Sequence, residues 1–259
     1  AFARDDRFTF GGDILDITGK TALITGAAAG IGRATAIAFA EAGATRLILC
    51  DIDEAGLAES KALAAREGIQ VDTQRLDVTD ADAFAALFDS DASIDIVFNN
   101  AGIVSGPPPY PGTPIKRIEL LVAINLTSVI VGSTLAIRHM QSHGRGGAIV
   151  NTASTGALNP YIDDAPYAAS KAGVVMFSRS CAALKDRDNI RVNAVLPGVT
   201  ETPILEKLGG GERPEWLGPI MDGIKVHQPS DIAAAVVRIV EDDGMAGEYV
   251  TLTNERAAA

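Results

Sequence analysis

The segment YAASK places Tyr167 four residues before Lys171 and directly after Pro166, where a helix can begin. Residues i and i+4 lie on one face of a helix, so the phenol and the ammonium are expected to point the same way. A phenol with a pKa of about 10 is a poor base at neutral pH, but a fixed ammonium nearby lowers that pKa. The spacing predicts a tyrosine that acts as general acid–base. Two surface side chains at a helix start are the alternative interpretation.

A serine follows the apolar segment GAIVNT (147–152) and precedes the tyrosine by 13 residues. The carboxyl ends of parallel strands line the ligand crevice of a sheet, so Ser154 and the first turn of the next helix are expected to meet there. A hydroxyl at that place can hold a substrate oxygen and donate to a developing charge. Thr152 and Thr155 are competing hydroxyls, and a simple turn serine is the alternative; the spacing favours Ser154.

The first apolar segment runs directly into TGAAAGIG (25–32). A dinucleotide pyrophosphate requires backbone N–H groups at a helix N-terminus and no side chains in the way. Gly26 is expected to permit the tight turn, Gly30 the close approach of the ligand, and Gly32 the packing of the helix on the sheet. A glycine triplet alone would also suit any tight strand–helix turn.

An acidic residue ends the next apolar segment, LILCD, 19 residues after Gly32. At this place Asp51 can accept hydrogen bonds from the adenosine ribose and would repel a 2′-phosphate, which predicts NAD rather than NADP as cofactor. Capping of the helix that starts near Asp53 is the alternative role. Arg33 and Arg46 are the basic residues nearby that could favour a phosphate.

Short apolar segments alternate with helical stretches along the whole chain. This alternation predicts an α/β fold, a Rossmann-like doubly wound parallel sheet of about seven strands with helices on both faces, in a single domain. Most strands are expected to be buried on both faces. The strands are expected at 21–25, 46–50, 71–76, 94–98, 147–152, 190–196 and 248–252, and the helices near 30–42, 53–67, 79–90, 113–143, 165–186 and 229–242.

The domain is expected to cover residues 16–253, between an N-terminal tail (1–15) and a C-terminal tail (254–259). Two segments interrupt the strand–helix rhythm. Residues 102–114 are rich in proline and glycine and predict a loop, and residues 200–230 are long and weakly periodic. Within the second, residues 200–228 predict a substrate-binding lid with Gly209–Gly211 as its hinge.

Charge and composition exclude several classes of function. The net charge of −11 argues against nucleic acid as a partner, because phosphate binding requires a basic surface. Cys50 and Cys181 form no disulfide or metal pattern, and His139 and His143, which share a helix face, have no acidic ligands nearby, so no metal is expected. The chain has no uninterrupted apolar stretch of about 20 residues and no signal-peptide core, so we expect a cytoplasmic protein without a membrane span.

The sequence resembles the short-chain dehydrogenases/reductases, in their shorter single-domain form, over nearly its whole length (about 16–253). The order and spacing of several separate motifs carry this resemblance: TGAAAGIG, Asp51, LDV (76–78), NNAG (99–102), INLTS (124–128), Ser154, YAASK and NAVLPGVTETP (193–203). Two features depart from the family pattern. The strand before Ser154 reads NTAS where the family often has paired serines, and the C-terminus lacks the usual glycine-ending segment.

The resemblance implies a catalytic tetrad of Asn125, Ser154, Tyr167 and Lys171. In it Tyr167 is the acid–base, Ser154 positions the reacting oxygen, Lys171 lowers the tyrosine pKa and binds the nicotinamide ribose, and Asn125 holds a water of the proton relay.

The resemblance also implies the cofactor site. Asp77 and Val78 would lie at the adenine, Asn99 beside the cofactor, and Val199 and Thr202 at the nicotinamide carboxamide. The full expected set is Gly26, Gly30, Ile31, Gly32, Asp51, Ile52, Asp77, Val78, Asn99, Ala101, Gly102, Tyr167, Lys171, Pro197, Gly198, Val199 and Thr202.

Taken together, these residues predict an NAD-dependent oxidoreductase that interconverts a secondary alcohol and its ketone. Apolar residues in 201–226 and in the loops near 103–115 and 158–161 favour a hydrophobic or cyclic alcohol. The alternatives are an NADP-dependent ketone reductase on the same fold and a non-catalytic dinucleotide-binding protein. The resemblance further implies a homo-oligomer, a tetramer or a dimer.

Overall fold

The computed structural model describes residues 16–89, 94–215 and 217–257, and the expected N-terminal tail (1–15) lies outside these residues. The described chain forms one domain around a parallel seven-stranded sheet with the order β3-β2-β1-β4-β5-β6-β7. The order reverses between β1 and β4, which opens a crevice at their carboxyl ends. The strands are β1 (Thr21–Thr25), β2 (Arg46–Asp51), β3 (Gln70–Arg75), β4 (Ile94–Asn99), β5 (Gly147–Thr152), β6 (Ile190–Pro197) and β7 (Tyr249–Leu252).

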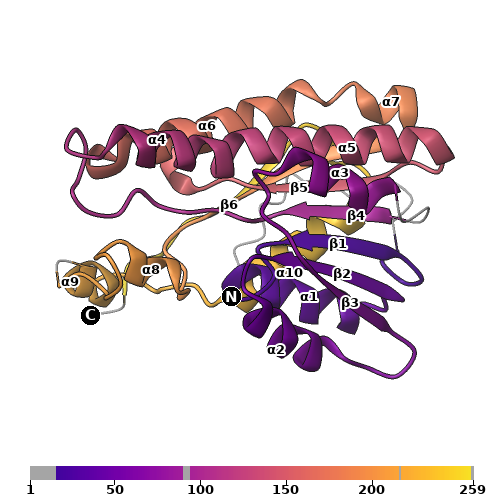
Figure 1. The fold of residues 1–259 in the computed structure, drawn as a ribbon, viewed down its shortest axis with the longest axis horizontal. Coiled ribbons are helices and arrows are strands. Elements are labelled where there is room, and N and C mark those ends of the chain that lie inside the picture. The colour runs from indigo at the N-terminus through magenta and orange to yellow at the C-terminus, as the bar shows by residue number, and fades with distance from the viewer. Residues whose placement is uncertain (1–15, 90–93, 216, 258–259) are drawn as a thin grey trace.

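Helices cover both faces of the sheet (Figure 1). One layer holds α1 (Gly30–Glu41), α2 (Glu54–Ala64) and α10 (Pro229–Glu241). The opposite layer holds α3 (Ala81–Asp89), α4 (Ile115–Val122), α5 (Ser128–His143), α6 (Ala165–Ser180) and α7 (Leu184–Asp188). Two short helices of the 200–228 segment, α8 (Ile204–Lys207) and α9 (Leu217–Asp222), lie beyond one end of the sheet, on the side where β6 ends (Figure 1).

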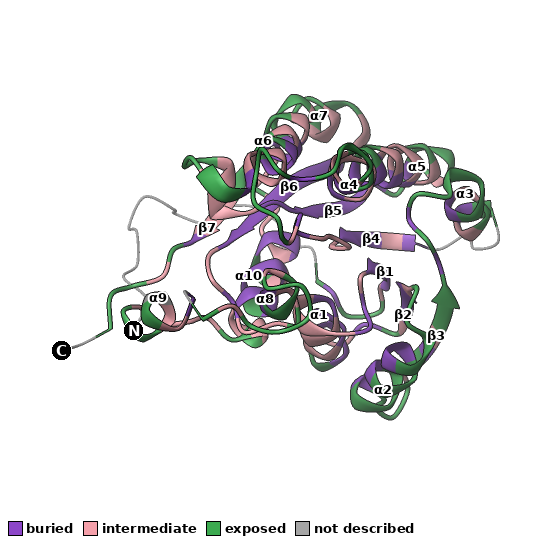
Figure 2. Cartoon of the chain, turned by 60° about the vertical axis from the view of Figure 1, so that its left-hand side comes forward, coloured by how far each residue is buried: buried purple, intermediate pink, exposed green. Residues whose placement is uncertain are grey.

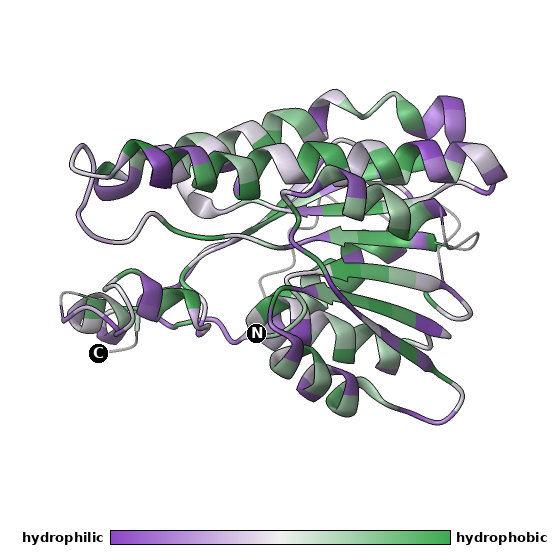
Figure 3. Cartoon of the chain, viewed as in Figure 1, coloured by the Kyte–Doolittle hydropathy of each residue, from purple (hydrophilic) through white to green (hydrophobic). Residues whose placement is uncertain are grey.

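The central strands are buried because helices pack on both of their faces. Every residue of β1, β5 and β6 is buried, and their side chains are largely apolar (Figures 2 and 3). Most strands are buried, as expected, and the exceptions are the edge strands β3 and β7, in each of which a single residue is buried, Val71 and Leu252. Strand β3 lies at the sheet edge, and polar side chains there stay in water (Figure 2).

The helical stretch expected at 113–143 is one continuous run, Ile115–His143, with a π-helical turn at Ala123–Thr127 between α4 and α5. Within the described residues, this run is long and apolar enough to cross a membrane by length and composition, which differs from the sequence expectation. A core helix of a soluble protein passes the same test, and this run packs against β4, β5 and α6. Its length is therefore weak support for a membrane span.

The stretch expected at 165–186 is divided, because α6 ends at Ser180 and α7 begins at Leu184. The backbone N–H groups of Cys181 and Ala182 bond to carbonyls three residues back, so the chain turns more tightly there than an α-helix. The segment expected as a C-terminal tail is paired where it is described. Ile224 bridges Arg256, and the Lys225 N–H donates to the Glu255 carbonyl.

Gly132 marks a tight contact between α5 and the sheet. A Cβ there would lie 2.6 Å from Asn99 Oδ1 and 2.7 Å from Phe84 Cζ. We expect Gly132→Ala to lower the free energy of unfolding by about 1–3 kcal/mol, because the core has no space for the methyl group. Urea unfolding followed by circular dichroism measures this. Gly218→Ala is the control, since its Cβ would meet open space; an equal loss in both variants would contradict the prediction.

Candidate active site

The turn between β1 and α1 is built to receive an anion. Gly26 has a φ of +66°, and a Cβ at Gly32 would lie 2.1 Å from the Gly26 carbonyl oxygen. The N-cap residue is Ala29, whose side chain cannot cap the helix, and the first turn of α1 holds no acidic residue. The first N–H groups of the helix, including those of Ile31 and Gly32, therefore point to the crevice with no carboxylate competing for them.

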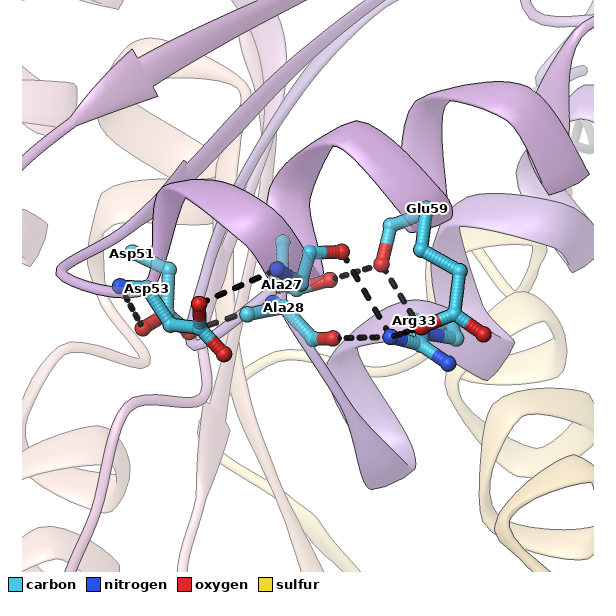
Figure 4. Close-up of polar contacts among 8 residues, drawn as sticks. Ala27, Ala28, Arg33, Asp51, Asp53 and Glu59 are labelled. Atoms are coloured by element: carbon cyan, nitrogen blue, oxygen red, sulfur yellow. Dashed lines mark hydrogen bonds and ion pairs between the residues drawn. The ribbon is translucent and has the colours of Figure 1, made fainter.

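Asp51 lies beside this turn, at the end of β2. Its Oδ2 accepts a hydrogen bond from the Ala28 N–H (3.1 Å), and its Oδ1 accepts one from the Asp53 N–H (3.1 Å) (Figure 4). The helix cap is Asp53 itself, which accepts from the Gly56 N–H (3.0 Å). The alternative role considered for Asp51, capping α2, thus belongs to Asp53, and the Asp51 carboxylate is held at the turn.

The two basic residues that the sequence analysis placed near Asp51 both have acidic partners, but of the two only Arg33 lies at the glycine turn, because Arg46 begins β2 and Asp51 ends it. The Arg33 guanidinium donates to Glu59 Oε2 (2.7 Å), to the Ala28 carbonyl (2.5 Å) and to Ser60 Oγ (3.0 Å) (Figure 4). Arg46 pairs with Asp72 (2.8 Å). Both backbone groups of Ala28 are therefore held, because its N–H donates to Asp51 and its carbonyl accepts from Arg33.

The two asparagines of NNAG face different surroundings. Asn99 is 3% exposed and donates to Ser133 Oγ and Asn151 Oδ1 within the core, so its side chain is turned away from the glycine turn. Asn100 instead donates to the carbonyls of Thr25 and Gly26 (both 3.2 Å). Consecutive residues of a strand point to opposite faces, so only one of the pair can reach this turn. The sequence analysis placed Asn99 beside the cofactor and did not single out Asn100, whose side chain contacts the glycine turn.

Ala101 and Gly102 continue from this contact into the site. The Ala101 N–H donates to Thr25 Oγ1 (3.2 Å). A Cβ at Gly102 would lie 3.5 Å from both Asn125 Oδ1 and Lys171 Nζ. Two members of the expected tetrad therefore meet at Gly102, next to the glycine turn.

Asn125 lies in the π-helical turn, fully buried. Its Oδ1 accepts from the Ile103 N–H and its Nδ2 donates to the Ile103 carbonyl (both 2.8 Å). Such single π-turns within α-helices are frequent at functional sites. The side chain holds the start of loop 102–114 against the site.

Tyr167 and Ser154 meet at the start of α6. Ser154 N-caps the short helix Thr155–Ala157, and its Oγ accepts from the Gly156 N–H (3.1 Å). A Cβ at Gly156 would lie 3.5 Å from Ser154 Oγ and 3.9 Å from Tyr167 Cε1. Ser154 lies close enough to the Tyr167 hydroxyl to lower the pKa of that phenol. The competing hydroxyl of Thr152 donates to Asn100 Oδ1 (3.3 Å) and is engaged there.

Lys171 reaches the same site from one turn further along α6. It is 3% exposed, its Nζ donates to the Thr152 carbonyl (2.8 Å), and it lies 5.8 Å from the centroid of the Tyr167 ring. Burial disfavours the ammonium and lowers the pKa of Lys171 to about 8.

The pKa of Tyr167 differs from the expectation drawn from the Tyr–Lys spacing. Burial raises it to about 12, the hydrogen bond with Ser154 lowers it, and the nearby Tyr161 and Asp164 raise it. Removal of water from the phenolate therefore outweighs the favourable contacts in this arrangement. Ser154 is the neighbour that favours the ionised form.

The turn after β6 closes the opposite side of the crevice. A Cβ at Gly30 would lie 3.1 Å from Thr202 Cγ2, so this turn approaches the glycine turn directly. Asn254 holds Val199 by both backbone groups: its Oδ1 accepts from the Val199 N–H (2.7 Å) and its Nδ2 donates to the Val199 carbonyl (2.8 Å). A Cβ at Gly198, which follows Pro197, would lie 2.3 Å from Asn254 Oδ1. The sequence reasoning missed Asn254, because it took this segment for a tail.

The residues expected around the adenine lie on the β2–β3 side. The Leu76 N–H donates to the Asp51 carbonyl (2.9 Å), which brings Asp77 and Val78 next to Asp51. Asp77 accepts from the N–H and hydroxyl of Thr79, and these bonds lower its pKa. Ile52 is 61% exposed and offers an apolar side chain beside Asp51.

The described residues contain no group of three or more His, Cys, Asp or Glu side chains placed to hold a metal ion. His139 and His143 do share a helix face, but their rings pack against each other (5.2 Å) and His139 packs on Phe88 (5.6 Å).

The family model described as short chain dehydrogenase matches residues 20–213. The chain belongs to the short-chain dehydrogenase/reductase family. Members are oxidoreductases acting on CH–OH groups and bind a nicotinamide dinucleotide. The resemblance stated from the motifs is confirmed, as is the expected single-domain Rossmann-like fold.

Three relatives span nearly the whole chain. The 15-hydroxyprostaglandin dehydrogenase [NAD(+)] of Bos taurus is 36% identical over 259 residues, covering 93% of this chain and 94% of the relative. The cis-4-hydroxycyclohexanecarboxylate dehydrogenase of Sinomonas cyclohexanicum is 36% identical over 228 residues, with coverage of 86% and 90%. The crystal structure of carveol dehydrogenase from Mycobacterium avium in complex with NAD is similar with a TM-score of 0.84, 28% identity, and coverage of 92% and 97%.

The site fits the dinucleotide that the family binds. The close approaches at Gly26 and Gly32 leave only backbone at the helix N-terminus, which suits a pyrophosphate. Asp51 offers carboxylate oxygens at the place of the adenosine ribose. The buried ammonium of Lys171 lies beside Gly102 and Tyr167, where a ribose hydroxyl can accept a hydrogen bond.

Asn254 offers a test of how the turn at Val199 is held. We expect Asn254→Ala to release this turn and the 224–227 segment, because it removes the three hydrogen bonds to Val199 and Lys225. At about 1 kcal/mol per bond the three bonds contribute about 3 kcal/mol, so local opening and hence tryptic cleavage at Lys225 should rise about 100-fold. Thr253→Ala changes the exposed neighbouring residue and is the control. Equal cleavage rates in the two variants would contradict this role.

Proposed function

We propose that this protein is an NAD-dependent alcohol dehydrogenase that interconverts a secondary, hydrophobic or cyclic alcohol and its ketone. The observation that carries the proposal is the convergence of two pairs of side chains beside a glycine turn suited to a dinucleotide. Asn125 and Lys171 meet at Gly102, Ser154 and Tyr167 meet at Gly156, and Lys171 Nζ lies 5.8 Å from the centroid of the Tyr167 ring. The proposal includes assembly as a dimer or tetramer, supported by exposed apolar residues on α4–α6 such as Ile115, Leu120 and Met176.

Each of the four side chains has a distinct task in the proposed reaction. A bound nicotinamide supplies the hydride acceptor for alcohol oxidation. Tyr167 accepts the hydroxyl proton of the alcohol while the carbinol carbon of the alcohol loses a hydride. Ser154 holds the oxygen of the alcohol by a hydrogen bond. Lys171 keeps a positive charge near the phenol, and Asn125 fixes the loop that forms one wall.

The NAD preference is supported by the charges around the ribose site. The Asp51 carboxylate is held at the glycine turn and would repel a 2′-phosphate. Arg33, which could have attracted that phosphate, is paired with Glu59, and Arg46 lies at the other end of β2 from Asp51. The bovine relative is named for NAD(+) and the carveol dehydrogenase structure holds NAD, which agrees with this preference.

The substrate class is supported by the residues around Tyr167. The Tyr161 ring packs edge-on against the Tyr167 ring at 6.3 Å. Leu158, Ile162 and Tyr110 are 49%, 81% and 47% exposed on the adjoining loops. Aromatic and aliphatic surface of this kind suits an apolar ring or chain on the alcohol. The two curated relatives are named for hydroxylated organic substrates, a prostaglandin and a cyclohexanecarboxylate.

The first test is NAD reduction, followed at the nicotinamide absorbance, with a panel of hydrophobic and cyclic secondary alcohols. We expect Tyr167→Phe to lower kcat/KM by about 100-fold to 10,000-fold, because general acid–base catalysis is lost. Tyr161→Phe is the matched control, since it removes a phenol 6.3 Å away and keeps the ring. Full activity of Tyr167→Phe would overturn the proposed role, and NAD binding without turnover of any alcohol would favour a non-catalytic dinucleotide-binding protein.

The second test concerns the cofactor. We expect Asp51→Ala to lower the ratio of kcat/KM with NAD to kcat/KM with NADP about tenfold or more, which corresponds to about 1.4 kcal/mol. The variant removes the carboxylate that accepts hydrogen bonds from the ribose of NAD, and it also removes the negative charge that repels the 2′-phosphate of NADP. Asp53→Asn removes a charge two residues away and keeps a good helix cap, so the ratio should stay near that of the wild type. A wild type that prefers NADP would support the ketone reductase alternative instead.

A further inference from the structure

A carboxylate without a task in the reaction described above is buried next to Tyr167. Asp164 is 5% exposed and N-caps α6. Its Oδ1 accepts from the Tyr167 N–H (3.2 Å) and from Ser105 Oγ (2.6 Å), and its Oδ2 accepts from the Ser105 N–H (2.8 Å). Three donors on two oxygens suit a carboxylate anion, which can only accept hydrogen bonds.

Ser105, the partner of Asp164, belongs to loop 102–114 and is also fixed from the other side. Arg117, in the first turn of α4, donates to the Ser105 carbonyl (3.0 Å) and to the Val104 carbonyl (2.7 Å). The same loop is also bonded to the segment before α6, because the Tyr110 N–H donates to the Asp163 carbonyl (3.0 Å). The loop is therefore held between α4 and the start of α6, and Asp164 is the side chain that joins it to the tyrosine.

The same loop contacts the segment expected to form the lid. A Cβ at Gly106 would lie 3.1 Å from the Lys207 carbonyl oxygen, and one at Gly210 would lie 3.2 Å from Pro107 Cγ. Ser105 therefore directly precedes Gly106 and Pro107, the two residues that lie against Lys207 at the end of α8 and against Gly210. Asp164 links the backbone of Tyr167 to the loop against which this segment rests.

We propose that Asp164 is a positioning residue that fixes Tyr167 against loop 102–114 and sets the pH range in which the tyrosine works. The inference rests on the proposed dehydrogenase function. A buried carboxylate that accepts a hydrogen bond from the Tyr167 backbone N–H (3.2 Å) places a negative charge next to this residue and opposes formation of its phenolate. Consistent with this, Asp164 is among the groups that raise the pKa of Tyr167, after burial and Tyr161.

The other charged and titratable groups around the phenol are the same residues in the wild type and in an Asp164 variant. Lys171 lies on the same helix, 5.8 Å from the ring centroid, and Tyr161 lies on the preceding loop. Asp163 is exposed, and Arg117 approaches from α4 through the carbonyl of Ser105. A change in the pH dependence of an Asp164 variant therefore reports the charge of Asp164.

The experiment compares pH profiles of kcat/KM for alcohol oxidation in four proteins: wild type, Asp164→Asn, Ser105→Ala and Asp163→Asn. Oxidation needs the phenolate, so activity falls as pH decreases through the Tyr167 pKa. Loss of the Asp164 charge lowers that pKa, and we expect the acid limb of Asp164→Asn to move down by about half a pH unit or more, with a lower plateau.

The two other variants separate charge from position. Ser105→Ala keeps the carboxylate and loses one bond to the loop, so its KM should rise while its acid limb stays in place. Asp163→Asn removes an exposed charge one residue away and should match the wild type in both respects. A purely structural Asp164 would lower the plateau of Asp164→Asn and leave its acid limb unchanged, which would overturn the inference.

A substrate-free measurement distinguishes failure of this inference from failure of the proposed function. The chain has four tyrosines, so ¹³C-tyrosine NMR can follow Tyr167, assigned by the signal missing in Tyr167→Phe. The titration of this signal should begin at lower pH in Asp164→Asn than in the wild type. If Asp164→Asn does not fold, Asp164→Ser keeps a helix cap without the charge and should show the same shift. Identical titrations would reject the inference even where Tyr167-dependent activity upholds the function.

Discussion

The turn after β1 and the end of β4 touch along their backbones, and the space between them admits no side chain. A Cβ at Gly26 would lie 2.9 Å from the Ala101 backbone, and Asn100 bonds across the contact to the carbonyls of Thr25 and Gly26. This approach is possible only where the strand order reverses, because the two crossover connections leave the sheet in opposite directions there. This backbone contact positions the N-terminus of α1, which suits a pyrophosphate, and also the loop that carries Gly102.

Burial governs the chemistry on the far side of this contact. It lowers the pKa of Lys171 to about 8 and raises that of Tyr167 to about 12, so it opposes charge on both members of the pair. The hydrogen bond from Ser154 acts in the other direction on the phenol. The proton-transfer properties of the tyrosine therefore depend on several neighbours, and the Tyr–Lys spacing alone does not set them.

The irregular segments around the site are held by polar side chains as well as by apolar packing. Asn125 and Arg117 bind the backbone of loop 102–114, and Asn254 binds both backbone groups of Val199. An unpaired backbone group away from water is costly, so a loop next to a buried site requires such partners. Asn125 and Asn254 lie 22 and 55 residues along the chain from the backbone groups they bind, which makes these segments dependent on the completed fold.

Local patterns in the sequence determined most of the architecture and much of the candidate site. Apolar segments between glycine turns predicted all seven strands, and β1 and β5 have the predicted ends. The glycine spacing, Asp51 and YAASK predicted which residues meet, because strand ends and helix faces follow from short-range geometry. Only the tertiary structure decided that Asn100 and not Asn99 faces the glycine turn, that Asn254 belongs to the body, and that Asp164 adjoins Tyr167. The direction of a side chain and the degree of its burial depend on partners distant in the chain, and no local pattern records them.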